Sequence, residues 1–241
     1  MAMTGLKAVF VVTRFKEDVS WIKNYTDNYV IYNKGESLGE GYNEVLLSND
    51  GHNQKDIFEF IYRNYENLPD LIAFLQGNPF AHCSRKDFNL LIKSEKFTSL
   101  ESYKNNVVSG RVNSEGFYIE HNNRIHYKNS DGLYTEKNNN FYIEWHQSLK
   151  RSRSPCIFKS FDDFMQSIFE NYEHLEWITF CPGSQYIIER ERALFYPKSF
   201  WKKLMSFLNN GFEMTEAHVI ERGVGLIFQN KYKHKRMKGK E

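Results

Sequence analysis

The sequence is poor in cysteine and proline and has no long hydrophobic run. Its 241 residues include five prolines and three widely spaced cysteines, Cys83, Cys156 and Cys181. A disulfide framework or a structural zinc site needs paired or closely spaced cysteines, so neither is expected. No apolar stretch approaches the ~20 residues of a membrane-spanning helix, and the first ten residues lack the pattern of a signal peptide. We therefore expect a cytoplasmic protein without a membrane span.

Several catalytic signatures are also absent. Gly35, Gly39 and Gly41 do not have the spacing of a dinucleotide-binding GxGxxG loop, and there is no P-loop, HExxH helix or GxSxG elbow. His82 and Cys83 are adjacent in the chain, but a nucleophilic Cys–His pair depends on contact through space. A catalytic thiol is not expected.

The aromatic content and the net charge indicate which kinds of ligand the protein can bind. The chain is 16% aromatic, with 20 Phe, 15 Tyr and 4 Trp, and its formal net charge is only +2. Aromatic rings fill cores and also stack on sugars and bases. The basic bias lies in the segment from Lys231 to Lys240, whereas a nucleic-acid binder normally has a basic face on its folded domain. We predict that this tail is solvated and frayed and that nucleic acid is not the partner.

The first part of the chain alternates strand and helix patterns. Short β-branched and apolar runs predict buried strands at Lys7–Thr13, Tyr29–Asn33 and Leu71–Gln76. Apolar residues on one face predict a helix from Asn53 or Gln54 to Tyr65, with Asn53 as its N-cap. Strand, helix and strand at this spacing indicate a parallel sheet with right-handed crossovers.

The remaining chain divides into an aromatic middle and a helical end. Within residues 86–155, runs at Phe117–Glu120, Arg124–Lys128 and Phe141–Trp145 indicate a β-rich insertion, which either shapes a substrate pocket or extends a sheet. Residues 156–230 predict further helices and strands, and we expect one domain over 1–241 because no repeat or linker is present. The expected elements are a helix capped by Ser160, strands Trp177–Cys181 and Tyr186–Glu189, a helix from Pro197 to Gly211, and a helix over Thr215–Phe228.

Polar side chains follow the three N-terminal strands, where a parallel α/β sheet binds ligands. An arginine there can hold a diphosphate through two hydrogen bonds, or it can pair on the surface with Glu17 or Asp18. A lysine can neutralise phosphate charge or simply be a solvated turn residue. After the third strand, the polar residues Gln76, Asn78 and His82 lie next to Gly77 and Pro79. Packing in the core does not easily explain polar residues at this place. The candidates are Arg14, Asn33, Lys34, Gln76, Asn78 and His82.

A second group of candidates lies near the C-terminal end. Ser184 and Gln185 lie in a tight turn between two strands, and His218, Glu221 and Arg222 lie on the last helix. Glu221 is next to inward-facing residues, so it either borders a cleft as a general base or forms a surface pair with Arg222.

A further acid–base candidate lies in the aromatic middle. Glu144 and His146 alternate along the predicted strand Phe141–Trp145 and its extension. Glu144 and Glu221 together would be the carboxylate pair of a glycoside hydrolase, which is a less favoured reading.

Five segments resemble a known family. Residues 11–22 (VVTRFKEDVSWI), 29–36 (YVIYNKGE), 62–82 (YRNYENLPDLIAFLQGNPFAH), 181–201 (CPGSQYIIERERALFYPKSFW) and 217–228 (AHVIERGVGLIF) are similar, in this order, to glycosyltransferase-like proteins of fungi, algae and large DNA viruses. Residues 87–150 have no counterpart. The chain also resembles chlorovirus sugar transferases, among them a xylosyltransferase, that build capsid-protein glycans in the host cytoplasm.

The resemblance implies a GT-A-like, Rossmann-like mixed sheet flanked by helices, with a nucleoside diphosphate sugar, a UDP-sugar in particular, bound across the strand ends. Many such enzymes hold a divalent metal with an Asp-x-Asp motif, which corresponds here to Gln76-Gly77-Asn78. Amides are poor ligands for a hard dication, so we expect no metal requirement, although Mn²⁺ remains an option. Arg14, Lys34 and His82 then stabilise the leaving diphosphate.

The resemblance also assigns roles. The late glutamate of the family matches Glu221, which implies an inverting transfer to a glycan or glycoprotein hydroxyl with Glu221 as the base and the aromatic middle against the acceptor. The family pattern Gly-Arg-Glu is replaced by Gly51-His52-Asn53, so no role transfers to His52 or Asn53. The nucleotide-sugar contacts are expected to be Arg14, Asn33, Lys34, Asp56, Gln76, Asn78 and His82; the acceptor or phosphate contacts are expected to be Ser184, Gln185, Arg222 and His218.

Two other function classes remain open. A glycan-binding module without catalysis would bind oligosaccharide and show no preference for a nucleoside diphosphate. A nucleic-acid-binding protein acting through the basic tail and the aromatics would show a steep salt dependence.

Overall fold

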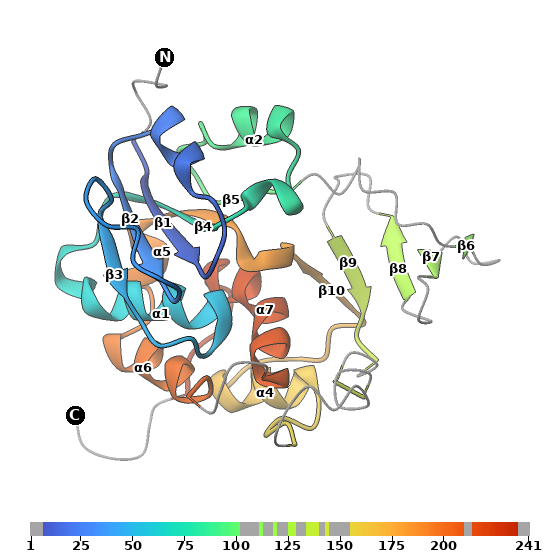
Figure 1. The fold of residues 1–241 in the computed structure, drawn as a ribbon. Helices are drawn as coiled ribbons and strands as arrows, with labels where there is room; N and C mark the ends of the chain where they lie inside the picture. The colour runs from blue at the N-terminus through green and yellow to red at the C-terminus, as the bar shows by residue number, and fades with distance from the viewer. Residues whose placement is uncertain are drawn as a thin grey trace.

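The centre of the molecule is a six-stranded mixed β-sheet (Figure 1). In the computed structural model, the described residues are 7–101, 111–112, 118–119, 125–128, 134–139, 143–144, 155–209 and 214–235. The sheet has the order β3-β2-β1-β4-β11-β5. Its strands are β1 (Val9–Arg14), β2 (Tyr29–Asn33), β3 (Glu44–Leu46), β4 (Leu71–Gln76), β5 (Thr98–Ser99) and β11 (Tyr186–Glu189).

The four strands β3, β2, β1 and β4 are parallel, whereas β11 is antiparallel to β4 and β5 is antiparallel to β11. The prediction of an α/β protein with a mixed sheet is confirmed, and the arrangement is compatible with a Rossmann-like fold. The predicted bounds of β2, β4 and β11 are those observed. The short strands β3 and β5 were not predicted, because two or three residues carry too little periodicity to be recognised.

Helices cover both faces of this sheet (Figure 1). One face carries α1 (His52–Arg63), α4 (Phe161–Ile168), α6 (Lys198–Ser206) and α7 (Thr215–Phe228), and α2 (Arg85–Leu91) lies on the other. A short helix, α5 (Arg190–Leu194), follows β11. The predicted cap of α4 is confirmed, since Ser160 Oγ accepts a hydrogen bond from the Asp163 N–H at 2.9 Å.

Two predicted helix ends are wrong. The N-cap of α1 is Gly51, with a φ of 64°, and no side chain caps this end; Asn53 lies inside the helix. Helix α6 ends at Ser206 instead of continuing to Gly211, which lies outside the described residues. Gly51 suits its position because a left-handed backbone carries no Cβ penalty in glycine.

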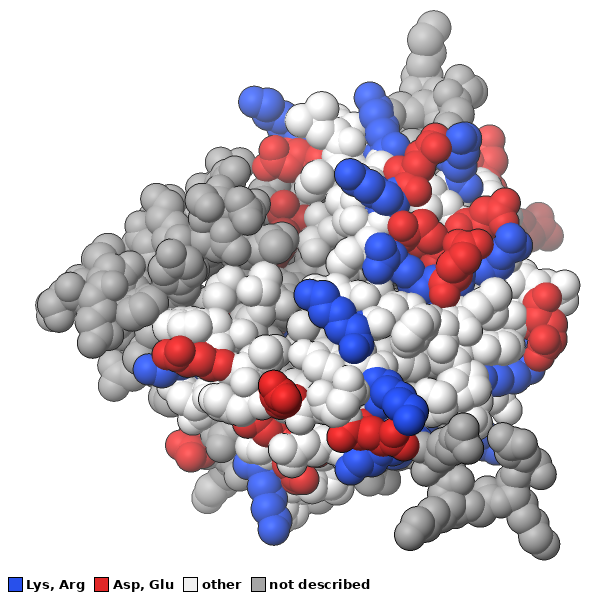
Figure 2. Space-filling view, turned by 180° about the vertical axis from the view of Figure 1, so that it is seen from behind, with Lys and Arg blue, Asp and Glu red and all other residues white. Residues whose placement is uncertain are grey.

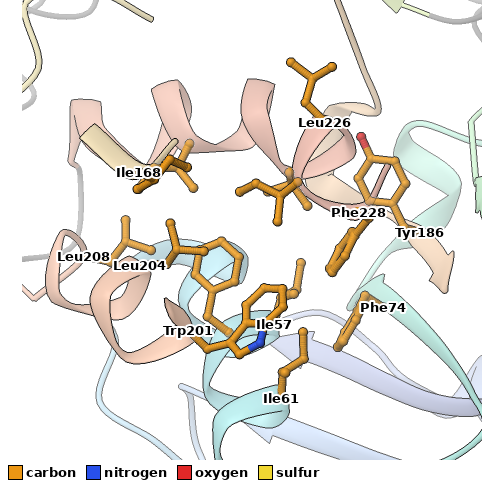
Figure 3. Packing of buried hydrophobic residues seen from close by; sticks show 14 of the residues in the cluster. Ile57, Ile61, Phe74, Ile168, Tyr186, Trp201, Leu204, Leu208, Leu226 and Phe228 are labelled. Atoms are coloured by element: carbon orange, nitrogen blue, oxygen red, sulfur yellow. The ribbon is translucent and has the colours of Figure 1, made fainter. Parts of the chain in front are cut away.

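The larger hydrophobic cluster lies between the sheet and helices α1, α4, α6 and α7 (Figure 3). Phe74 of β4 stacks on Phe228 of α7 with ring centroids 6.1 Å apart. Trp201 of α6 is fully buried, and its indole N–H donates to the Ala193 carbonyl at 3.1 Å. Burying side chains of this size contributes about 1.5–3 kcal/mol each, so this cluster holds the helical layer against the sheet.

A second, antiparallel sheet contains the aromatic middle of the chain. Its strands, in the order β10-β9-β8-β7-β6, are β10 (Trp177–Phe180), β9 (Tyr134–Lys137), β8 (Ile125–Lys128), β7 (Tyr118–Ile119) and β6 (Arg111–Val112). The prediction of a β-rich insertion is confirmed in this part of the chain. The strand predicted at Phe141–Trp145 is wrong at its described residues, because Ile143 and Glu144 are helical; His146 lies outside them.

A buried ion pair joins the second sheet to α7. Arg222 Nη2 donates to Glu136 Oε2 of β9 at 2.8 Å, and both side chains are buried. The guanidinium also lies 4.8 Å from the centre of the Phe180 ring of β10. The predicted pair of Glu221 with Arg222 is observed at 3.7 Å, but it is largely buried and not on the surface. The expected contact of Arg222 with a ligand is replaced by these contacts inside the protein.

The start of the basic tail is also docked rather than frayed, which corrects the prediction for its first residues. Glu170 N–H donates to the Lys233 carbonyl at 2.9 Å, and Lys235 N–H donates to the Ile168 carbonyl at 2.8 Å. The ring of Tyr232 packs 5.1 Å from that of Phe169. Residues 236–241 lie outside the described residues. No helix in the described part of the chain is long and apolar enough to cross a membrane.

We predict that Glu136→Gln lowers the free energy of unfolding by about 3–5 kcal/mol, because it leaves the buried guanidinium of Arg222 without its nearest carboxylate. Urea denaturation measures the change. Glu95→Gln is the matched control: it breaks an exposed ion pair with Lys7 and is expected to cost no more than about 1 kcal/mol. Equal effects of the two substitutions would contradict the structural role of the buried pair.

Candidate functional site

A pocket of about 420 Å³ opens at the carboxyl ends of β1, β2 and β4. Residues just after these strands line it, together with residues at the start of α1. The predicted convergence of the strand ends is therefore confirmed. The lining comprises Thr13, Arg14, Phe15, Glu17, Lys34, Asn49, His52, Asn53, Gln76, Gly77, Asn78 and Ala81.

Arg14 enters the pocket wall in a fixed position. Its Nη1 donates to Asn33 Oδ1 at 2.8 Å and to the Glu36 carbonyl at 2.9 Å, and its Nε donates to the Glu17 carbonyl at 3.0 Å. The alternative of a surface ion pair with Glu17 or Asp18 is not observed, because Glu17 contributes its backbone carbonyl and not its carboxylate. Arg14 is thus a pre-positioned cation at the end of β1.

Asn33 is a support for Arg14 and not a ligand contact. It is completely buried and does not line the pocket. Its Oδ1 accepts from Arg14 and from the Gly35 N–H, and its Nδ2 donates to the Glu36 carbonyl and to Glu44 Oε2 at 2.6 Å. With its amide engaged in this way, the predicted contact with a nucleotide sugar is wrong.

The ammonium group of Lys34 is also committed to the protein. Its Nζ donates to the Asp50 carbonyl at 2.8 Å and to the His52 carbonyl, and it lies 3.0 Å from Asp56 Oδ1. These three acceptors match the three hydrogens of an ammonium group. Lys34 lines the pocket and fixes its wall through these contacts. Its expected role in neutralising phosphate stays a prediction, and its ammonium group is already engaged by the protein.

Asp56 is the buried partner of Lys34 and does not line the pocket. Burial raises the pKa of Asp56 to about 7, against the opposing effects of the Lys34 charge and of hydrogen bonds from Lys34 and Thr13. The desolvation of a carboxylate exceeds the attraction of one buried cation here. Its predicted role as a nucleotide-sugar contact is replaced by a structural one.

The last residue of β4 and the two residues that follow it line the pocket as well. Gly77 allows a close approach of Glu17, whose side chain would lie 2.9 Å from a Cβ at this position, and its carbonyl accepts the Trp21 indole N–H at 2.8 Å. Gln76 and Asn78 line the pocket, and Asn78 is exposed. Both are in the predicted position for a ligand.

His82 lies close to this wall but is not among the lining residues. It is half-buried, and burial lowers the pKa of its imidazole. A neutral ring is favoured there, which argues against the predicted role of His82 as a cation at the diphosphate.

A tight turn, η4 (Pro182–Ser184), connects the pocket to α7. Gly183 has a φ of 76°, and a Cβ there would lie 2.6 Å from Gln76 Cδ. Its carbonyl accepts a hydrogen bond from Asn53 Nδ2, and its N–H donates to Glu221 Oε1 at 2.6 Å. Gly183 is therefore in contact both with pocket residues and with the candidate base.

The neighbours of Gly183 are buried, which corrects two predictions. Ser184 and Gln185 have no exposed surface. Ser184 Oγ accepts from Gln54 Nε2 at 3.1 Å, and Gln185 Oε1 accepts from the Gln76 N–H at 3.2 Å. Neither side chain lines the pocket; together they hold η4 against α1 and β4.

The two carboxylate candidates differ in position. Glu221 lies on α7 behind η4, with its side chain 16% exposed and its Oε2 3.7 Å from Arg222 Nη1. Glu144 is exposed and does not line the pocket. Of the two, Glu221 is the carboxylate that the structure connects to the pocket wall.

Two histidines adjoin the pocket from different helices. His52, at the first position of α1, lines the pocket, and its ring centroid lies 5.1 Å from that of His218 on α7. Sequence reasoning included His218 but assigned no role to His52 or Asn53, because the family pattern Gly-Arg-Glu is replaced by Gly51-His52-Asn53. The contact of His52 with His218, 166 positions away, had no local signal in the sequence.

The described residues provide no cluster of metal ligands, and the pKa of the buried Cys181 thiol is raised. Among the described residues, no group of three or more His, Cys, Asp and Glu side chains is arranged to hold a metal ion. Cys83 and Cys181 are buried and form no disulfide, and burial raises the pKa of Cys181 well above its ordinary value. A reactive thiolate is therefore disfavoured at Cys181.

A family model described as a protein of unknown function, DUF3431, matches residues 10–239. The chain belongs to the DUF3431 family. No curated protein and no solved structure matches it significantly. The match extends from β1 to the tail, so every candidate residue of the pocket and of α7 in this DUF3431 protein lies inside the family domain.

We predict that Asp56→Asn changes the pH dependence of stability. Because the folded-state pKa of about 7 is above the ordinary value of ~3.9, the contribution of Asp56 is fully present below about pH 4 and is lost as the pH rises through about 7. The free energy of unfolding of the wild type, minus that of the variant, should therefore fall between about pH 5 and about pH 8.

Urea denaturation across this pH range tests the prediction. Asp70→Asn is the control, since the side chain of Asp70 is 86% exposed and forms an exposed ion pair with Arg190, which contributes little to stability. A difference for Asp56→Asn that stays constant or rises with pH would show that Asp56 is not held in its neutral form by burial.

Proposed function

We propose that this protein is a glycosyltransferase that moves a sugar from a nucleoside diphosphate sugar, a UDP-sugar in particular, to a glycan hydroxyl. The observation that carries the proposal is the position of the pocket. In open α/β sheets, ligands bind beyond the carboxyl ends of the strands, at the place where the strand order reverses. The resemblance of the sequence to glycosyltransferase-like proteins supplies the reaction.

The strand order identifies that place. From β1 the chain adds β2 and β3 on one side of the sheet and then places β4 on the other side of β1. The reversal lies between β1 and β4, and the last residues of both strands, Arg14 and Gln76, line the pocket. Its volume of about 420 Å³ lies in the ordinary range for a small-molecule site, about 300–1,000 Å³. A GT-A-like arrangement is the finer form of this fold that we propose.

The pocket suits a diphosphate that leaves without a metal. The guanidinium of Arg14 is held at its rim by Asn33 and two carbonyls, and a fixed cation stabilises developing negative charge without reorganisation. The amino end of α1, which carries no side-chain cap, faces the same space through His52 and Asn53 and adds the positive end of a helix dipole. No carboxylate stands at Gln76-Gly77-Asn78 to recruit a dication.

The acceptor lies on the α7 side in this proposal. Glu221 is the general base that removes the proton of the attacking hydroxyl, and the transfer inverts the anomeric centre. The support is the contact of Glu221 with Gly183, whose neighbours in space, Gln76 and Asn53, line the pocket. We propose a cytoplasmic reaction on a glycan or glycoprotein, as in the capsid-glycan xylosyltransferases that the sequence resembles.

A thermal-shift screen against nucleoside diphosphates and their sugars, with EDTA and with Mn²⁺, tests the proposal. A ligand at ~100 times its dissociation constant should stabilise the fold by about 2.7 kcal/mol. We expect a shift with one nucleoside diphosphate, a larger shift with one of its sugars, and no loss of either in EDTA. A shift with oligosaccharide and none with any nucleotide would replace the transferase with a glycan-binding module.

A nucleic-acid-binding function is less favoured by the surface charge. Figure 2 shows Lys and Arg interspersed with Asp and Glu over the described part of the face opposite to that of Figure 1. A basic footprint on the folded domain is the usual sign of such binding, and this face does not carry one. Binding of nucleic acid with a steep salt dependence would overturn this reading.

We predict that Glu221→Gln lowers the turnover of sugar transfer by about 10²–10⁴-fold, because the amide keeps the shape of the side chain and cannot accept the proton. The rate of release of the nucleoside diphosphate measures the effect. Glu144→Gln is the matched control and should keep near-normal turnover. If Glu221→Gln turns over normally, the assignment of the base is wrong even where nucleotide binding is established.

A further inference from the structure

The structure leaves the pocket with less positive charge than the sequence indicated. Lys34 is bound to Asp56 and two carbonyls, Arg222 is bound to Glu136, and His82 is not among the lining residues. Among the cations first assigned to the diphosphate, Arg14 is the one in the lining that is held by uncharged groups. The other basic side chains in the lining are that of Lys34, already paired with Asp56, and that of His52, with His218 against it.

The backbone holds His52 in an unusual conformation. Gly51 and His52 have consecutive positive φ angles of 64° and 52°, and a left-handed backbone is uncommon for a residue other than glycine. The Lys34 ammonium group donates a hydrogen bond to the carbonyl of His52 and thereby stabilises this conformation. Residues in such uncommon backbone conformations persist only where the surrounding structure holds them in place, and they are concentrated at functional sites.

We propose that His52 binds the diphosphate of the nucleotide sugar as an imidazolium, and that His218 positions its ring. This inference rests on the proposed function and names the group that replaces Lys34. An imidazole has an ordinary pKa near 6.5, so its charge changes across the physiological range. Affinity for the nucleotide sugar should therefore rise as the pH falls.

Other charged groups surround His52 and His218 and contribute to the pH dependence of ligand binding. Arg14 and Glu17 line the same pocket, and the Lys34–Asp56 pair lies behind the carbonyl of His52. On α7, Glu221 and Arg222 follow His218 by about one turn. Asp56 is the one of these groups with a raised pKa near neutrality, so the experiment must separate its titration from that of His52.

The test measures the dissociation constant of UDP-xylose by calorimetry near pH 6 and near pH 8.5 for the wild type and four variants: His52→Asn, His218→Gln, His174→Gln and Asp56→Asn. Both phosphates of a nucleotide sugar are esterified, so the ligand lacks the ionisation near pH 6 of a terminal phosphate. His52→Asn removes the imidazole and keeps a residue that accepts a left-handed backbone. His218→Gln removes the positioning ring, and His174→Gln removes a histidine that is 60% exposed and bound to Asp162 outside the pocket.

For the wild type and His174→Gln we expect binding about tenfold tighter near pH 6 than near pH 8.5, the size of one charge-assisted hydrogen bond. His52→Asn should match the wild type near pH 8.5 and lose the gain near pH 6, although Asp56 is still present. His218→Gln should reduce the gain and keep part of it. Uridine, which has no phosphate, should bind each variant equally at both pH values and thereby show that the fold is intact.

Three outcomes would overturn the inference. Equal affinity of the wild type at both pH values would show that no imidazolium is involved. A pH dependence kept in His52→Asn and lost in Asp56→Asn would assign it to Asp56. Failure of the wild type to bind UDP-xylose or any other nucleotide sugar is distinguishable from both, because it removes the proposed function as well.

Discussion

The pocket depends on one buried ammonium group. Lys34, at the end of β2, binds two carbonyls that precede and begin α1 and pairs with Asp56 one turn further along that helix. A buried charge without partners would cost several kcal/mol, so the chain from Asp50 to Asp56 must wrap around it. That wrapping sets the course of the pocket wall and turns the uncapped end of α1 toward the space beyond the strands.

The other walls are fixed by polar groups in the same manner. Asn33 holds Arg14 after β1, and Gln185 holds the backbone of Gln76 after β4. Gly183 joins Asn53 of α1 to Glu221 of α7 through its carbonyl and its N–H. Polar groups that are buried and satisfied make a site rigid, since any displacement leaves one of them without a partner. The groups that face the pocket are thus supported by a layer of others that do not.

This division explains which candidate residues line the pocket. Arg14, Gln76 and Asn78 line the pocket, as their positions after buried strands indicated. Asn33, Asp56, Ser184, Gln185 and Arg222 are equally polar, yet they are buried. Residue type and spacing do not distinguish a side chain that contacts a ligand from one that supports it, because the distinction depends on which atoms already have partners.

The sequence by itself determined several helices and strands and the edge of the sheet at which their polar residues gather. Buried apolar runs and turn residues located β2, β4, β11 and α7 to the residue, and the parallel order of the first strands required their polar ends to meet, because a parallel sheet places all carboxyl ends together. Only the tertiary structure decided where each charge is used. It paired Lys34 with Asp56, Arg222 with Glu136, and His52 with His218. Contacts between residues 22, 86 and 166 positions apart arise from packing, which no local pattern encodes.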